Sequence, residues 1–285
     1  MIRSLAFNPL ITCARFLERA MRRAPLFRLW QRGCSAIARF LKTFYPGGYV
    51  PVEYDEELVG ELRKAFASLA NPVKLLFFSD PESECEHCDD IRSILKLLAS
   101  ASDKVSVLEL AKGSAEAERL NIRMYPAIVV HGVKECNIRF FGTPAGYEFA
   151  ALVEDVIDAS RGEPKNLNPR IAAALRDHVA GKTVIKVFVT PTCPYCPLAV
   201  RTAHRFAMVN DRIYGDMIEA LEFLELADKY GVYVVPKIVI EVNGEDRSEF
   251  EGALPDAYFA AEVLKANGVD PAAVGILPAG RRGGV

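Results

Sequence analysis

The sequence contains the same cysteine pattern twice, and each copy is followed by the same second feature. The C-x-x-C pairs are Cys85–Cys88 and Cys193–Cys196. A proline that leads an apolar, strand-like run follows each of them: Pro126 comes 41 residues after the first pair begins, and Pro236 comes 43 residues after the second begins. One C-x-x-C is weak evidence for any fold. A repeated pair with a repeated proline predicts two copies of one folding unit.

The second pair occurs where a predicted strand is followed by a predicted helix. The apolar run 184–189 is typical of a buried strand, and a helical pattern opens with Pro197, a residue suited to the first helical turn. The N-terminus of a helix carries partial positive charge and unpaired N–H groups, which stabilise a thiolate. We therefore predict that Cys193 is the nucleophile and that Cys196, one turn further on, resolves the mixed disulfide.

The first pair is predicted to react in the same way, with Cys85 and Cys88 as its thiols. His87 and Glu86 lie between them. A protonated imidazole lowers the pKa of a neighbouring thiol, whereas a carboxylate disfavours the thiolate, so these two residues act in opposite directions. The alternative for His87 is an exposed turn residue.

Apolar periodicity predicts the same order of elements in both halves: helix, strand, C-x-x-C helix, strand, helix, proline-led strand, hairpin and helix. The ranges in the first half are a helix from Asp55, a strand at 73–78, a helix after Cys88, a strand at 105–110, a helix at 116–120, strands at 126–130 and 138–141, and a helix ending near 159. Those in the second half are a helix at 171–179, a strand at 184–189, a helix from 197, a helix at 221–230, a strand at 234–240 and a helix ending near 267. The pattern gives no range for the second strand of this half.

These patterns divide the chain into four parts. We expect a basic extension at 1–50, one α/β unit at 51–163, a second at 164–268 and a loose tail at 269–285. Each unit is expected to be a mixed central sheet flanked by helices.

Charge and composition limit the classes of function. Residues 1–50 carry a net charge of +8 and the remainder −10, so the body is acidic and gives no reason to expect binding of nucleic acid. The extension is either an amphipathic segment that makes weak contact with a membrane or a partner, or a segment that is poorly ordered, or one that is absent from the mature protein because translation starts later. The uncharged run 4–14 is too short to span a bilayer and no signal-peptide cleavage site follows it, so we expect a cytoplasmic protein. A single Gln and nine Asn favour a thermophilic source.

Three stretches resemble the protein disulfide oxidoreductases of hyperthermophiles, also called glutaredoxin-like proteins. They are residues 141–150, 189–201 and 235–247, and the similarity extends over about residues 53–267. The resemblance implies two fused thioredoxin folds that together are similar to a minimal protein disulfide isomerase. It also implies a redox-active cysteine pair in each fold, with the second dominant, and a cis proline facing each pair, at Pro126 and Pro236. Pro194 and Tyr195, between the second pair, resemble the glutaredoxin motif, and we expect Pro194 to tune the potential.

The same resemblance indicates which other molecules take part. It implies no cofactor other than the redox-active cysteines. It implies protein disulfides and dithiols as substrates, and an electron donor similar to thioredoxin reductase. Whether the chain reduces, forms or isomerises disulfides does not follow, because these activities share the same residues and differ in reduction potential.

Two alternatives stay open at this point. The cysteine pairs could hold zinc or an iron–sulfur cluster, although a separation of 108 residues is far greater than in zinc ribbons. The chain could also be a chaperone or scaffold without catalytic activity. No functional role is assigned to the remaining cysteines and histidines: Cys13, Cys34, Cys136, His131, His178 and His204.

Overall fold

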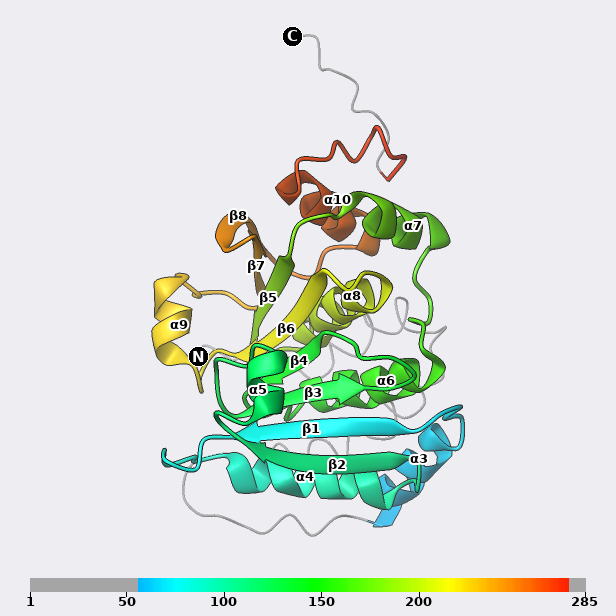
Figure 1. The fold of residues 1–285 in the computed structure, drawn as a ribbon, viewed down its shortest axis with the longest axis vertical. Helices are drawn as coiled ribbons and strands as arrows, with labels where there is room; N and C mark the ends of the chain where they lie inside the picture. The colour runs from blue at the N-terminus through cyan, green and yellow to red at the C-terminus, as the bar shows by residue number, and fades with distance from the viewer. Residues whose placement is uncertain (1–55, 277–285) are drawn as a thin grey trace, which may run out of the picture. The chain divides into compact units, whose positions relative to one another are not determined.

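The computed structural model describes residues 56–276 (Figure 1). The chain divides into two compact units, Met1–Glu61 and Leu62–Val285; the first described helix spans this boundary, and the other described elements belong to the second unit. The predictions for the basic extension, including Cys13 and Cys34, lie outside the described residues, as does the end of the tail.

Both halves contain the predicted order of elements. The first half comprises α3 (Glu56–Phe66), β1 (Val73–Ser79), α4 (Cys88–Ser100), β2 (Val105–Ala111), α5 (Ala115–Arg119), β3 (Ala127–His131), β4 (Ile138–Phe141) and α6 (Glu148–Arg161). The second half comprises α7 (Pro169–His178), β5 (Thr183–Val189), α8 (Cys196–Val209), β6 (Ile213–Glu219), α9 (Leu224–Lys229), β7 (Lys237–Val242), β8 (Glu245–Glu251) and α10 (Asp256–Ala266).

The two sheets are joined into one. The strand order is β2-β1-β3-β4-β6-β5-β7-β8, and β4 pairs in parallel with β6 from Ile138 opposite Gly215 to Phe141 opposite Ile218. The halves therefore meet edge to edge rather than as separate sheets. Within each half the pairing is the same: one parallel partner, one antiparallel partner and a terminal hairpin.

Alternate strand residues face opposite sides of this sheet, and each side has its own helices. Phe78 and its neighbours pack in one apolar cluster with residues of α5 and α9, including Ala117 and Leu226. Phe77 and Phe140 face the other side of the sheet. On that side Arg92 of α4 lies over the Phe77 ring, and His204 of α8 contacts the Phe140 ring. The two helices that follow the cysteine pairs thus cover the same face.

Buried ionic contacts hold the two halves together. Arg139 of β4 donates two hydrogen bonds to Asp216 of β6, both at 2.7 Å. Beside this strand pair, Arg201 of α8 contacts three carboxylates of α6, and His204 lies 2.6 Å from one of them. Those carboxylates are Glu154, Asp155 and Asp158. Burial lowers the pKa of His204 to about 3, so the ring is neutral at physiological pH.

The structure corrects some predicted boundaries. Helix α8 begins at Cys196, with Pro197 in its first turn, and α6 continues to Arg161, beyond the predicted end near residue 159. Helix α9 is shorter than the predicted 221–230. Strand β6, for which the sequence pattern gives no range, is paired on both sides. Its sequence includes Gly215, Asp216 and Glu219, residues that weaken an apolar strand pattern.

Both predicted cis prolines are confirmed, at Tyr125–Pro126 and Val235–Pro236. The same hydrogen bond recurs after each: Gly142 N–H donates to the Pro126 carbonyl, and Gly252 N–H donates to the Pro236 carbonyl. No helix within residues 56–276 is both long and apolar enough to cross a membrane.

Candidate active site: two cysteine pairs on one edge of the sheet

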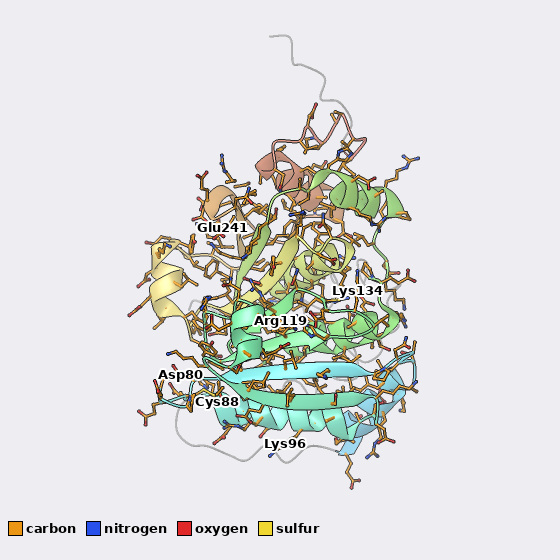
Figure 2. The ribbon with its side chains drawn as sticks, viewed as in Figure 1. Asp80, Cys88, Lys96, Arg119, Lys134 and Glu241 are labelled. Carbon is orange, nitrogen blue, oxygen red and sulfur yellow. A yellow bond between two sulfur atoms is a disulfide. The ribbon has the colours of Figure 1, made fainter. Side chains whose placement is uncertain are left out.

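Both cysteine pairs lie at the same end of the sheet, next to the carboxyl ends of β1 and β5. β1 is antiparallel to β3 and β3 to β4, while β4, β6 and β5 are mutually parallel, so β1 and β5 run in the same direction. Each pair follows the carboxyl end of its strand. Four inter-strand steps separate β1 from β5, which is about 19 Å at the usual strand spacing. Figure 2 shows Cys88 and Asp80 at this end of β1.

At the second pair, the two thiols differ in exposure. Cys193 lies in the loop after β5, where its N–H donates to the Thr190 carbonyl, and Cys196 is the first residue of α8. Cys193 is 9% exposed and Cys196 is completely buried; both are free thiols. As a thiol, Cys193 donates to the carbonyl of Val235, the residue before the cis proline, at 3.6 Å. The pair and Pro236 are therefore brought together as predicted.

The two thiols also differ in proton affinity. The pKa of Cys193 is lowered to about 6, mainly because the Cys196 thiol donates to it, with further help from the N–H groups of Tyr195 and Cys196. The same contact, together with burial and the charge of Glu148, raises the pKa of Cys196. Cys193 is thus the thiolate at neutral pH and Cys196 holds the proton.

Exposed apolar side chains surround the second pair. Tyr195 and Leu198 flank Cys196 in the sequence and are each about half exposed. Tyr233 and Val234, just before Val235, are also exposed, Tyr233 almost completely. The positions around the first pair are instead charged, with Glu84 and Glu86 both exposed.

A buried carboxylate from the first half faces the second pair. Glu148, the first residue of α6, is 1% exposed, and neither of its carboxyl oxygens has a hydrogen-bond partner elsewhere in residues 56–276. Burial, above all, raises its pKa well above the ordinary value, and the charge of Cys193 adds to this. Sequence reasoning missed this residue, because an acidic residue in a first helical turn usually only complements the helix dipole. Only the joining of the halves brings it to Cys193.

Close contact between two loops places Glu148 there. The N–H of Tyr147 donates to the Pro191 carbonyl, in the loop that leads to Cys193. Gly146 has φ +62°, and a Cβ at this position would lie 2.2 Å from the Pro191 oxygen. A glycine is therefore required for the approach.

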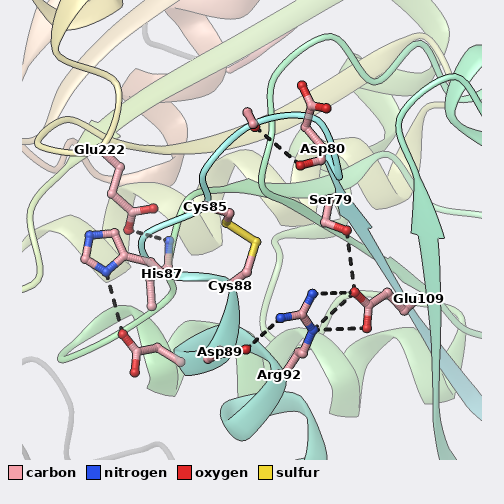
Figure 3. Close-up of a disulfide and its surroundings, with 12 residues drawn as sticks. Ser79, Asp80, Cys85, His87, Cys88, Asp89, Arg92, Glu109 and Glu222 are labelled. Atoms are coloured by element: carbon pink, nitrogen blue, oxygen red, sulfur yellow. Dashed lines mark hydrogen bonds and ion pairs between the residues drawn. A yellow bond between two sulfur atoms is a disulfide. The ribbon is translucent and has the colours of Figure 1, made fainter. Parts of the chain in front are cut away.

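At the first pair, Cys85 and Cys88 form a disulfide with a Cα–Cα distance of 5.5 Å (Figure 3). Cys85 is partly exposed and Cys88 buried, again at the start of a helix. His87 is the residue before α4, and its Nδ1 lies 3.6 Å from Asp90. Glu86, the other residue between the cysteines, is exposed to solvent.

A loop of the second half reaches the first disulfide. Figure 3 shows Glu222 beside His87 and Cys85, where its carboxylate accepts a hydrogen bond from the Thr143 N–H at 2.7 Å. Glu219, the last residue of β6, accepts from the Glu222 N–H at 2.5 Å. A Cβ on Gly142, whose φ is +87°, would lie 2.8 Å from the Glu219 Cβ. Each half thus contributes carboxylates to the surroundings of the other half's cysteines.

The remaining histidines and Cys136 lie elsewhere. His131 and His204 are buried and His178 is exposed at the end of α7. Cys136 is buried in the first hairpin, where burial raises its pKa to about 11. Within the described residues, no group of three or more His, Cys, Asp or Glu side chains is arranged to hold a metal ion. At four strands apart, the two pairs are too distant to share one tetrahedral zinc.

Comparison with known proteins agrees with this geometry. Residues 183–265 match the family model described as thioredoxin domain. The crystal structure of a protein disulfide oxidoreductase from Aeropyrum pernix superposes with a TM-score of 0.67 at 31% identity, covering 78% of this chain and 97% of that one. The chain belongs to the thioredoxin-fold protein disulfide oxidoreductases. The two fused folds expected of this family are those that share the eight-stranded sheet.

The chain is also similar to components of alkyl hydroperoxide reductase and to a protein named NADH dehydrogenase. A structure of the alkylhydroperoxide reductase component AhpF from Enterococcus faecalis has a TM-score of 0.65 at 26% identity, covering 74% of this chain and 99% of that one. The same component of alkyl hydroperoxide reductase from Escherichia coli is 24% identical over 79% of this chain and 43% of its own length. A Bacillus subtilis protein named NADH dehydrogenase is 24% identical over 67% of this chain and 34% of its own length. The chain thus spans less than half of these curated relatives.

Proposed function

We propose that this chain catalyses thiol–disulfide exchange on protein substrates, with Cys193 and Cys196 as the dominant pair. The observation that supports this most is the opposite proton affinity of two adjacent thiols, one a thiolate at neutral pH and the other protonated. The exposed apolar side chains around Cys193 suit a polypeptide substrate, because a protein disulfide is usually flanked by side chains that gain from apolar contact.

The reaction proceeds in two steps. The Cys193 thiolate attacks one sulfur of a substrate disulfide, forms a Cys193–substrate bond and releases the other substrate sulfur as a thiolate. Cys196 then loses its proton and attacks the Cys193 sulfur. The Cys193–Cys196 bond forms, the bond to the substrate breaks, and the substrate leaves as a second thiolate. Two electrons pass from the dithiol to the substrate, and the reverse sequence oxidises a substrate dithiol.

Glu148 is proposed as the base for the second step. Cys196 is buried and holds its proton tightly, so its attack requires a nearby acceptor. Glu148 has carboxyl oxygens without a hydrogen-bond partner elsewhere in residues 56–276, and burial raises its pKa; both properties suit it to take up a proton and to return it in the reverse direction. Its charge acts on Cys196, which supports this assignment.

The first pair is proposed as a second exchange centre. Cys85 is the more exposed sulfur and would react with substrate, with Cys88 as the resolving cysteine and Pro126 facing the pair. Electrons would be carried by the cysteines themselves and supplied by a dithiol donor similar to thioredoxin reductase. His87 is proposed to favour the Cys85 thiolate, and Glu86 to oppose it.

Insulin reduction tests the proposal. With dithiothreitol as the electron source, Cys193→Ser and Cys196→Ser are each expected to lower turnover by more than about tenfold, because the nucleophile or the resolving thiol is lost. The double variant Cys85→Ser/Cys88→Ser is expected to lose less. Cys136→Ser, which changes a buried cysteine away from both pairs, is the matched control and should retain full turnover.

Retained turnover in the variants of the second pair would contradict this assignment and favour a scaffold. Stoichiometric zinc in the purified protein, together with no insulin reduction, would favour the metal-binding alternative.

A further inference from the structure

Two carboxylates lie between the cysteine pairs, and the chemistry proposed above uses only one of them. In the strand order, β4 and β6 lie between β1, which leads to the first pair, and β5, which leads to the second. Glu148 follows β4, and Glu219 is the last residue of β6. Both residues therefore lie at the end of the sheet where the two cysteine pairs are found.

Among the described residues, no ion pair involves the carboxyl group of Glu148 or of Glu219. Glu148 is 1% and Glu219 2% exposed. Within residues 56–276, both oxygens of Glu148 and Oε1 of Glu219 have no hydrogen-bond partner, while the other oxygen of Glu219 accepts from the Glu222 N–H. Two carboxylates buried in this way repel each other, so ionisation of one disfavours ionisation of the other.

Each of the two faces a different cysteine pair. Besides burial, charge on Cys193 and on Glu219 raises the pKa of Glu148. Burial raises the pKa of Glu219 to about 7, the charge of Glu222 adds to this, and a charged His87 opposes it. His87 and Asp90, beside the first disulfide, also act on Glu222. The titratable groups that act on the two carboxylates are therefore Cys193, Glu222 and His87, and Glu148 in turn acts on Cys196.

We propose that Glu148 and Glu219 share protons as a coupled pair and thereby connect the two cysteine pairs. This inference rests on the function proposed above for Glu148. The proton that leaves Cys196 converts Glu148 to its neutral acid, which removes an anion from the vicinity of Glu219 and favours ionised Glu219. A negative charge at the first pair acts on Glu219 in the opposite direction. Glu219 is thus a positioning residue, which sets the pH at which Glu148 is ready to accept the Cys196 proton.

The first test is the pH dependence of Cys193 alkylation by iodoacetamide, measured by mass spectrometry on the reduced full-length chain. Because Glu148 faces Cys193, its ionisation should appear as a second inflection of the rate, absent in Glu148→Gln. Glu219→Gln removes the neighbouring anion and should shift this inflection to lower pH by about half a unit or more. Glu225→Gln, which neutralises an exposed carboxylate on α9, is the control and should leave the curve unchanged.

A second variant, Glu222→Gln, tests the same coupling in case Glu219→Gln does not fold. Glu222→Gln removes a charge that raises the pKa of Glu219, so Glu219 ionises at lower pH and the Glu148 inflection should move to higher pH. An inflection at the wild-type position in both folded variants would overturn the coupling. Alkylation requires no protein substrate, so this outcome is distinct from failure of the proposed function, which would appear as absence of insulin reduction by the wild-type chain.

The second test changes the charge at the first pair. Cys85→Asp and Cys85→Asn, each combined with Cys88→Ser, differ by one negative charge. At neutral pH the equilibrium constant of the second pair with glutathione should differ about twofold or more between the two chains, and the difference should disappear when Glu219→Gln is added. Equal constants in the first comparison, or a difference that persists with Glu219→Gln, would overturn the proposal.

Discussion

Cys193 owes its low proton affinity to groups of its own loop. The Cys196 thiol contributes most, and the N–H groups of Tyr195 and Cys196 add to it, so that together they outweigh the effect of burial. The N–H contribution follows from the position of the pair at a helix start, as the sequence predicts. The larger contribution does not, because it depends on how the two sulfur atoms are oriented in the folded loop.

Replacing Cys196 separates these contributions. In Cys196→Ala the donor to Cys193 is lost, so the pKa of Cys193 should rise from about 6 by about one unit or more. Cys196→Ser retains a donor and should show a smaller rise. The ultraviolet absorbance of the thiolate as a function of pH measures the change, with Cys136→Ala as control. A Cys193 midpoint that is the same in the alanine variant as in the wild type would show that the N–H groups are sufficient.

Among elements, the pair formed by β4 and β6 determines how the halves combine. Arg139 and Asp216 lie opposite each other in these strands, both nearly fully buried, with the guanidinium over the Tyr214 ring. A buried charge that loses its partner is costly, because neither water nor another ion replaces it. This ion pair therefore favours the observed register of the two strands.

Arg139→Met should destabilise the chain by about 3–5 kcal/mol in urea unfolding, since Asp216 remains buried without its partner. Adding Asp216→Leu should restore much of the loss. Arg119→Met, which breaks surface ion pairs with Glu116 and Glu135, is the control and should cost less than about 1 kcal/mol. Similar losses in the two arginine variants would mean that burial does not govern this contact.

Elements with regular apolar patterns are predictable from the sequence, and those with polar or inter-half contacts are not. The strands leading to the cysteines have largely apolar runs, and the cis prolines that follow are both confirmed. The sequence pattern misses β6 because its acidic residues are buried. Asp216 accepts hydrogen bonds from Arg139, and Glu219 accepts one from the Glu222 N–H. No local sequence pattern identifies Glu148 and Glu219 as functional residues, because each acts at the cysteine pair of the other half of the chain. The domain boundaries at 51–163 and 164–268 stay a prediction.

For the molecule as a whole, buried carboxylates make stability depend on pH. Glu219 has a pKa raised to about 7 in the folded chain, against 4.5 ordinarily, and that of Glu148 is also raised. Between pH 4.5 and about pH 7, Glu219 keeps a proton in the folded chain that it has released in the unfolded chain. Stability therefore falls as pH rises through this window.

Glu219→Gln should remove the part of this loss of stability that is caused by the ionisation of Glu219. With both cysteine pairs oxidised, so that thiols do not contribute, the wild-type free energy of unfolding should drop between about pH 5 and about pH 7.5, and the variant should lose about 2–3 kcal/mol less. Urea unfolding at the two pH values measures this, and Glu225→Gln should follow the wild type. Parallel pH dependence in the Glu219 variant would show that Glu219 titrates normally.

The parallel pairing of β4 with β6 also bears on what becomes of either half alone. Every residue of β4 is buried, and all but one of β6, so cutting the chain between α6 and α7 would leave each fragment with a newly exposed strand whose backbone N–H and C=O groups lack partners along one side. Such edges recruit strands from other molecules. A fragment containing one cysteine pair would thus be prone to dimerise or aggregate through the exposed edge, and the smallest well-behaved piece of this chain is the one that retains both.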